Sequence, residues 1–230
     1  MTPSSVSSAA PRQHMVEFLV LASHALQTPL SGIRWGLSRL HKSEKDSWTQ
    51  DQKKLLSHID ADARTLSRLL QSLILVTRAA DPAYVAQPES VDLAVSIAGI
   101  VGKAKEEGTT ITIDVGDMPN VYVDPLLLDG ILQNLLGVFV EAQVEDKSIG
   151  VSLSAAESMV TVHFDAPLEF PLINSDTVVG SDSQSGQIVG GTPGLMLSMA
   201  QTLAQVLQGT VEMEPTDDGM YRIDLTLPTV

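Results

Sequence analysis

The chain has 230 residues, of which 43% are hydrophobic and 18% charged, enough for one large or two small domains with a buried core. A net charge of -14 argues against nucleic-acid binding, because a polyanion must be met by clustered Lys and Arg side chains. The absence of cysteine excludes disulfides and thiolate metal sites, and no apolar run reaches the roughly 18 residues that a membrane span needs. These features favour a cytoplasmic protein.

The charges are divided unevenly along the chain. Residues 1–78 hold ten of the fourteen Lys and Arg and six of the 28 Asp and Glu, so this part carries +4 and the remainder -18. Opposite charge in two parts indicates two domains. Between Lys147 and Arg222 there is no Lys or Arg at all.

The N-terminal third of the chain has the pattern of a helical hairpin. Residues 1–11, rich in Ser, Ala and Pro, predict a disordered leader or the cut edge of a longer chain whose sensor region is absent. Apolar residues then recur at intervals of three and four over 15–40, which predicts one helix of about seven turns. Thr49 and Gln52 form a capping-box pattern at the start of a second apolar stripe that runs to Thr77.

So short a connection makes these two helices antiparallel neighbours. Two helices alone cannot enclose an apolar core, so the hairpin, residues 12–80, is expected to dimerise into a four-helix bundle. Residues 81–90 contain two prolines and predict a linker.

The remainder, residues 91–230, predicts an α/β sandwich with one helical layer on a mixed sheet. Residues 165–193 lack periodicity and are expected to form a functional lid or a disordered insert. The regular elements expected around this segment are a helix from Asp92 to near Gly108, a strand at 110–115, a helix with Asp124 as N-cap and Pro125 as first residue that runs to about Glu141, a hairpin of strands at 150–155 and 159–164, a helix at 194–208 that stops at Gly209, and two strands at 210–215 and 220–227.

His24 is the candidate functional residue of the hairpin. It points away from the apolar stripe, and a neutral, solvated imidazole is a nucleophile toward phosphorus at neutral pH. Thr28 lies one turn further on the same face, within reach of a phosphoryl group or an attacking water. Pro29, inside the helix, bends it beside the histidine.

The residues around His24 resemble the phosphoacceptor box of sensor histidine kinases, F-L-x-x-x-S-H-E-L-R-T-P-L-T-x-I; the matching residues are Phe18, Leu19, Ala22, Ser23, His24, Leu26, Thr28, Pro29, Leu30, Ser31 and Ile33. A helical hairpin followed by an α/β sandwich is similar to that family's dimerisation and catalytic domains. The resemblance implies that His24 is a phosphoacceptor in two-component signalling. Ala25 replaces the family's acidic residue, which helps to take the proton from histidine during autophosphorylation, and Gln27 replaces a residue that is often basic. General-base help is typically worth about two to four orders of magnitude, so self-phosphorylation should suffer.

The family's nucleotide boxes are only partly recognisable. Residues 132–141 resemble the asparagine box, in which Asn134 matches, while Val138 replaces the Mg-binding asparagine and Glu141 the lysine. In the first glycine box, Asp165 keeps the carboxylate that would meet the adenine amino group. Two glycines of that box are replaced by Pro167 and Glu169.

Residues 192–197 resemble the second glycine box, and only Gly194 of its glycines survives, with Met196 at another glycine position. The segment between Lys147 and Arg222 holds nine acidic residues and no cation, so a triphosphate of charge near -4 would be repelled. We therefore expect weak or absent ATP binding and no cofactor. Asn134, Asp165 and Gly194 are the nucleotide contacts if Mg-ATP is used; otherwise Asn134 and Asp165 keep only local structural roles.

Three functions follow from the resemblance. The first is a pseudokinase or phosphotransferase dimer in which His24 exchanges a phosphoryl group with the receiver aspartate of a response regulator, or receives it from an upstream histidine kinase. The second is an ATP-dependent sensor autokinase with divergent nucleotide boxes. The third is a non-catalytic dimeric scaffold for a response regulator.

Overall fold

The computed structural model describes residues 30–40, 48–106, 110–114, 116, 120–142, 148–156, 158–167, 172–174, 187–189, 191–216 and 220–229. His24 and Thr28 lie outside these residues. The chain divides into two compact units, Met1–Tyr84 and Val85–Val230, which are considered separately. Within the described parts of the chain, no helix combines the length and apolar character needed to cross a membrane.

The first unit contains the predicted second helix, α2 (Gln50–Ala79). Its start is the capping box read from the sequence: the Thr49 hydroxyl accepts a hydrogen bond from the Gln52 backbone N–H at 3.2 Å, and the Thr49 N–H donates to Gln52 Oε1 at 3.0 Å. Two otherwise unsatisfied amide groups are thereby paired, which confirms the predicted helix start.

The other arm of the hairpin is helical over residues 30–40, the described part of the helix expected at 15–40. Leu30 forms a buried apolar cluster with Ala63 and Leu70 of α2. Other members of the α2 apolar stripe stay exposed in the single chain, with Ile59 at 40% and Leu66 at 48%. The two arms therefore bury only part of their apolar surface, and the four-helix bundle stays a prediction.

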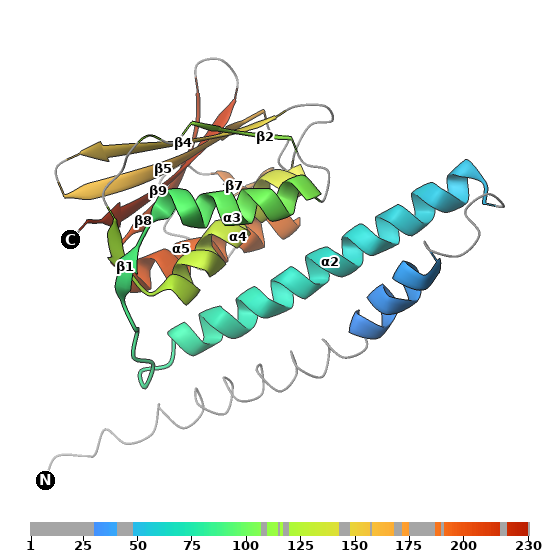
Figure 1. The fold of residues 1–230 in the computed structure, drawn as a ribbon, viewed down its shortest axis with the longest axis horizontal. Helices are drawn as coiled ribbons and strands as arrows, with labels where there is room; N and C mark the ends of the chain where they lie inside the picture. The colour runs from blue at the N-terminus through green and yellow to red at the C-terminus, as the bar shows by residue number, and fades with distance from the viewer. Residues whose placement is uncertain are drawn as a thin grey trace, which may run out of the picture. The chain divides into compact units, whose positions relative to one another are not determined.

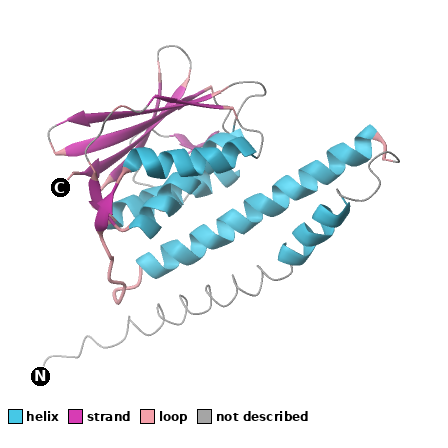
Figure 2. Cartoon of the chain, viewed as in Figure 1, coloured by secondary structure: helices cyan, strands magenta, loops and turns pink. Residues whose placement is uncertain are grey.

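The second unit is the predicted sandwich. Its five-stranded sheet has the spatial order β2 (Ile111–Asp114), β4 (Ile149–Ala156), β5 (Met159–Ala166), β9 (Tyr221–Pro228) and β8 (Thr210–Pro215). β2 and β4 are parallel, and the other neighbours are antiparallel. One layer of helices, α3 (Leu93–Glu106), α4 (Pro125–Ala142) and α5 (Gly191–Val206), covers one face (Figure 1), and Figure 2 shows the two layers by colour.

The two faces of the sheet are distinguished by alternation along β5. Val160, Val162, Phe164 and Ala166 are at most 3% exposed, and the ring of Phe164 stacks on Phe139 of α4 with centroids 5.7 Å apart. Even-numbered residues of β5 therefore face the helical layer. Because side chains alternate along a strand, the odd-numbered residues lie on the opposite face, which we call the outer face.

The helix that carries the predicted asparagine box begins as expected. Asp124 Oδ1 accepts hydrogen bonds from the N–H groups of Leu126 at 3.0 Å and Leu127 at 3.4 Å, while Pro125 occupies the first helical position. An aspartate cap followed by proline leaves few unsatisfied amides, so α4 starts at Pro125 and ends at Ala142, one residue beyond the predicted end.

Four short strands were not predicted. β1 (Glu89–Val91), which begins inside the expected 81–90 linker, pairs antiparallel with β3 (Val121–Val123). β6 (Leu172–Asn174) and β7 (Gln187–Val189) pair antiparallel inside residues 165–193, so the expectation that this segment lacks regular structure was wrong at these positions. Strands of three residues are too short to show a period of two, which explains the omission.

Candidate functional site

Asn134, the surviving residue of the asparagine box, lies inside α4. It is 3% exposed, and its Nδ2 donates a hydrogen bond of 2.8 Å to the carbonyl of Gly130 one turn earlier. This contact is internal to the helix. The amide therefore has a local structural partner, and its expected contact with a nucleotide stays a prediction.

Val138 and Met196 occupy two positions at which the family pattern has asparagine and glycine. Both are buried, Val138 at 0% and Met196 at 1% exposure. Met196 of α5 packs against α4 so closely that a Cβ added to Gly137 would lie 2.7 Å from the Met196 sulfur. Both positions thus hold buried apolar side chains, where the family pattern calls for a metal ligand and a glycine.

Gly194 belongs to the first turns of α5 and is partly exposed. The helix starts at Gly191, whose φ of 66° is favourable only for glycine, and Pro193 is buried within the first turn. A proline near a helix start costs no hydrogen bond, because that amide has no partner within the helix. Residues 192–194 thus lie at the start of α5, and the expected contact of Gly194 with a nucleotide stays a prediction.

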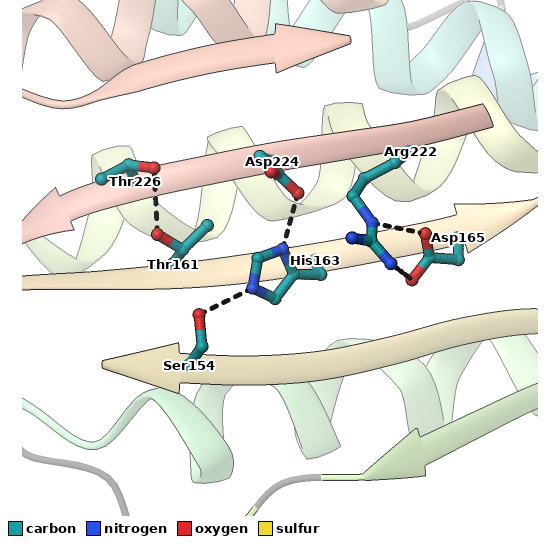
Figure 3. A network of polar contacts seen from close by, with 7 residues as sticks. All are labelled: Ser154, Thr161, His163, Asp165, Arg222, Asp224 and Thr226. Atoms are coloured by element: carbon teal, nitrogen blue, oxygen red, sulfur yellow. Dashed lines mark hydrogen bonds and ion pairs between the residues drawn. The ribbon is translucent and has the colours of Figure 1, made fainter. Parts of the chain in front are cut away.

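Asp165 lies on the outer face of the sheet, since its neighbours Phe164 and Ala166 face the helices. Its carboxylate accepts two hydrogen bonds from the guanidinium of Arg222 in β9. Nε donates to Oδ1 at 2.7 Å, and a second nitrogen donates to Oδ2 at 3.2 Å (Figure 3). The hydrogen bond with Asp165 is the main reason why the pKa of Arg222 is raised. The charges of Asp165, Asp224 and Glu214 add to this rise, and desolvation opposes it.

The side chains at these positions do not fit a magnesium nucleotide. An apolar residue stands at the metal position, the Met196 side chain fills space next to it, and the Asp165 carboxylate points away from the helical layer and is already paired. Arg222 is the first Lys or Arg after Lys147, and its guanidinium forms an ion pair with Asp165. We therefore assign no catalytic step to a bound nucleotide.

A second group of polar residues lies beside this pair on the outer face. His163 of β5 forms a hydrogen bond of 2.7 Å through Nδ1 to Asp224 Oδ1 of β9, and another of 2.7 Å through Nε2 to Ser154 Oγ of β4 (Figure 3). Thr161 and Thr226 are hydrogen-bonded at 3.1 Å. Sequence reasoning missed all these pairs, as well as Arg222; alternating polar residues on predicted neighbouring strands were the available signal.

The predicted phosphoacceptor and its neighbour are not placed by the structure. His24 and Thr28 lie outside the described residues, so their roles stay predictions that rest on the sequence. Residues 30–40 are the described part of the helix that the sequence predicts over residues 15–40.

Comparisons with known proteins agree with the fold. No family model matches the chain. It is 29% identical over 224 residues to the sensor histidine kinase GlrK of Escherichia coli strain K12 and, to the same extent, to the sensor histidine kinase QseE of Escherichia coli O157:H7. Each alignment covers 91% of this chain and 46% of the relative, so the chain spans about half the length of these curated relatives.

Solved structures share the fold. The full-length structure of ShkA, determined in complex with AMPPNP, matches 93% of this chain and 46% of its own with a TM-score of 0.58 and 20% identity. Histidine kinase AdeS of Acinetobacter baumannii matches 90% of this chain and 98% of its own, with a TM-score of 0.54 and 13% identity. A helical arm followed by this sandwich is thus a histidine-kinase-type fold. The two curated sequence relatives are likewise sensor histidine kinases.

Proposed function

We propose that this chain acts in two-component signalling by carrying a phosphoryl group on His24 and exchanging it with the aspartate of a response-regulator receiver domain, without efficient use of ATP. Similarity to two sensor histidine kinases supports the assignment to two-component signalling. The proposal that ATP is not used efficiently is supported by the burial of Val138 and Met196 at the nucleotide-box positions. The +4 charge of residues 1–78 suits an acidic receiver pocket.

Electrostatics supports the loss of ATP use. A Mg-triphosphate needs a metal ligand and usually some positive charge, but the described α4 offers Val138 at the ligand position. Arg222, the first cation after the Lys147 gap, lies on the outer face and is bound to Asp165. Together with Ala25 near the acceptor, these departures weaken the same reaction, transfer from ATP to His24, and leave the imidazole itself untouched.

An ATP-dependent autokinase is the second candidate, favoured by retention of Asn134 and Gly194 and by relatives that are named sensor histidine kinases. The test is thermal unfolding with and without millimolar Mg-ATP. A ligand at about 100 times its dissociation constant adds roughly 2.7 kcal/mol of stability, so a binder would show a clear rise in Tm. We expect no rise; a saturable rise that needs Mg²⁺ would favour the autokinase.

Phosphotransfer is tested by incubating the chain with a phosphorylated receiver domain and following the label. We expect label on the wild type and none on His24→Ala. The matched control is His58→Ala, because His58 is an exposed histidine on α2 and its loss should leave labelling unchanged. Absence of label on the wild type would favour the scaffold, in which the dimer binds a regulator without phosphoryl chemistry.

Thr28 is proposed to assist transfer or dephosphorylation of the partner, since it lies one helical turn from His24. Thr28→Ala should change the rate at which the phosphorylated receiver loses its label. Thr28→Ser keeps the hydroxyl and should restore it. An unchanged rate in Thr28→Ala would remove this residue from the site.

A further inference from the structure

Three strands of the sheet bring a serine, a histidine and an aspartate into one hydrogen-bonded chain on the outer face. Ser154 comes from β4, His163 from β5 and Asp224 from β9 (Figure 3). The order is Ser154 Oγ, His163 Nε2, His163 Nδ1 and Asp224 Oδ1, with both links at 2.7 Å. Neither the phosphoacceptor box nor the nucleotide boxes use any of these residues.

The arrangement fixes the roles of the imidazole nitrogens. An ionised carboxylate can only accept, so His163 Nδ1 carries the proton that Asp224 binds, and in the neutral ring Nε2 accepts the hydrogen bond of the Ser154 hydroxyl. This is the arrangement that activates a serine: a base in contact with the hydroxyl and a third group that orients the base.

Exposure decides which group can react. The side chains of His163 and Asp224 are only 20% and 28% exposed, held between neighbouring strands. Ser154 is exposed, so a molecule from solvent can reach its oxygen. Ser152, by contrast, is directly opposite His163 in the strand register, yet the hydrogen bond of the ring goes to Ser154.

We propose that Ser154 is a nucleophile that accepts an acyl group from an activated ester, with His163 as its base and Asp224 as the residue that positions the base. The Ser154 oxygen forms a bond to the ester carbonyl carbon while its proton passes to His163 Nε2. The bond from that carbon to the leaving oxygen breaks, and His163 returns the proton to the departing aryl oxide. The products are acyl-Ser154 and a phenol, and no oxidant or further reactant is needed.

The substrate class follows from the setting. Each preorganised oxyanion donor typically contributes about 10²- to 10³-fold in rate, and Ser154 sits on an exposed sheet face. Good leaving groups lower the need for such donors. Ser154 therefore accepts one acyl group from an activated donor, and it is a modification site on the outer face of the sheet.

The experiment uses 4-nitrophenyl acetate with the full chain. Release of 4-nitrophenolate is followed by absorbance, and the acetylated residue is located by peptide mass spectrometry. We expect acetylation of Ser154 in the wild type, loss of that product in Ser154→Ala, and at least a tenfold slower reaction in His163→Gln and Asp224→Asn. Ser152→Ala is the matched control and should react like the wild type.

Thermal unfolding of each variant separates chemistry from folding. Ser154 is exposed, so Ser154→Ala should stay folded, and its result stands even if Asp224→Asn unfolds. Acetylation of the wild type at other residues only, or equal acetylation of Ser154 in the wild type and His163→Gln, would overturn the proposal and leave a cross-strand structural contact. Because the assay contains no phosphoryl donor and its readout is acetylated Ser154, neither result bears on phosphotransfer through His24.

Discussion

At the scale of single residues, two positions of the segments that resemble the nucleotide boxes hold apolar side chains. Val138 and Met196 are part of the buried core, at 0% and 1% exposure. Replacing a buried apolar side chain with a smaller one leaves a cavity, and replacing it with a polar one buries a group without a hydrogen-bond partner. These two side chains therefore contribute to the stability of the second unit.

Truncation of Met196 tests how much this buried side chain contributes to stability. Met196→Ala should lower the free energy of unfolding by about 2–5 kcal/mol, because it removes a buried side chain and leaves a cavity. Leu195 is the matched control: it is adjacent on α5 but 48% exposed, so Leu195→Ala should cost well under about 1 kcal/mol. Urea unfolding measures both. Equal costs would mean that Met196 does not fill the core.

At the scale of elements, the long periodic segments were predictable and the pairings between them were not. α4 and the β4–β5 hairpin were expected because a cap, a proline and alternating apolar residues all lie close together in the sequence. The Arg222–Asp165 contact joins residues 57 positions apart and depends on the β5–β9 register. No local pattern fixes a register between strands so distant, so the contact of Asp165 with Arg222 could not be predicted from the sequence.

The end of α5 gives another example. The sequence predicts that this helix stops at Gly209, and the residue with a positive φ, 59°, is the preceding Gln208. Gly209 is needed for a different reason: a Cβ there would lie 2.5 Å from the carbonyl oxygen of Thr226 in β9. The glycine allows the chain to pass close to the sheet.

Two substitutions separate these roles. Gln208→Gly should stabilise the protein by up to about 1 kcal/mol, since a side chain at positive φ is strained. Gly209→Ala should destabilise it by more than this gain, because a backbone carbonyl cannot move away as a flexible side chain can. Thermal unfolding measures both changes. A stable Gly209→Ala variant, or a destabilised Gln208→Gly variant, would contradict the role assigned to that residue.

At the scale of the whole molecule, the hairpin of the first unit leaves apolar surface uncovered. On α2, Leu55, Ile59 and Leu66 lie along one side of the helix and are 61%, 40% and 48% exposed, next to the side that Ala63 and Leu70 bury against Leu30. A continuous apolar strip of this kind on a long helix favours a partner helix. A second copy of the hairpin would cover it and complete four helices.

The proposed dimer is tested by placing a charge in that strip. Ile59→Glu or Leu66→Glu should turn a dimer into a monomer, because association would bury an unpaired carboxylate, whereas the folded single chain leaves both positions in solvent. Ala61→Glu is the matched control, because Ala61 is exposed on the opposite side of α2 and the change adds the same charge. Sedimentation equilibrium gives the mass of each species, and circular dichroism checks that the helices persist. If all three variants keep the mass of the wild type, the strip does not form the interface.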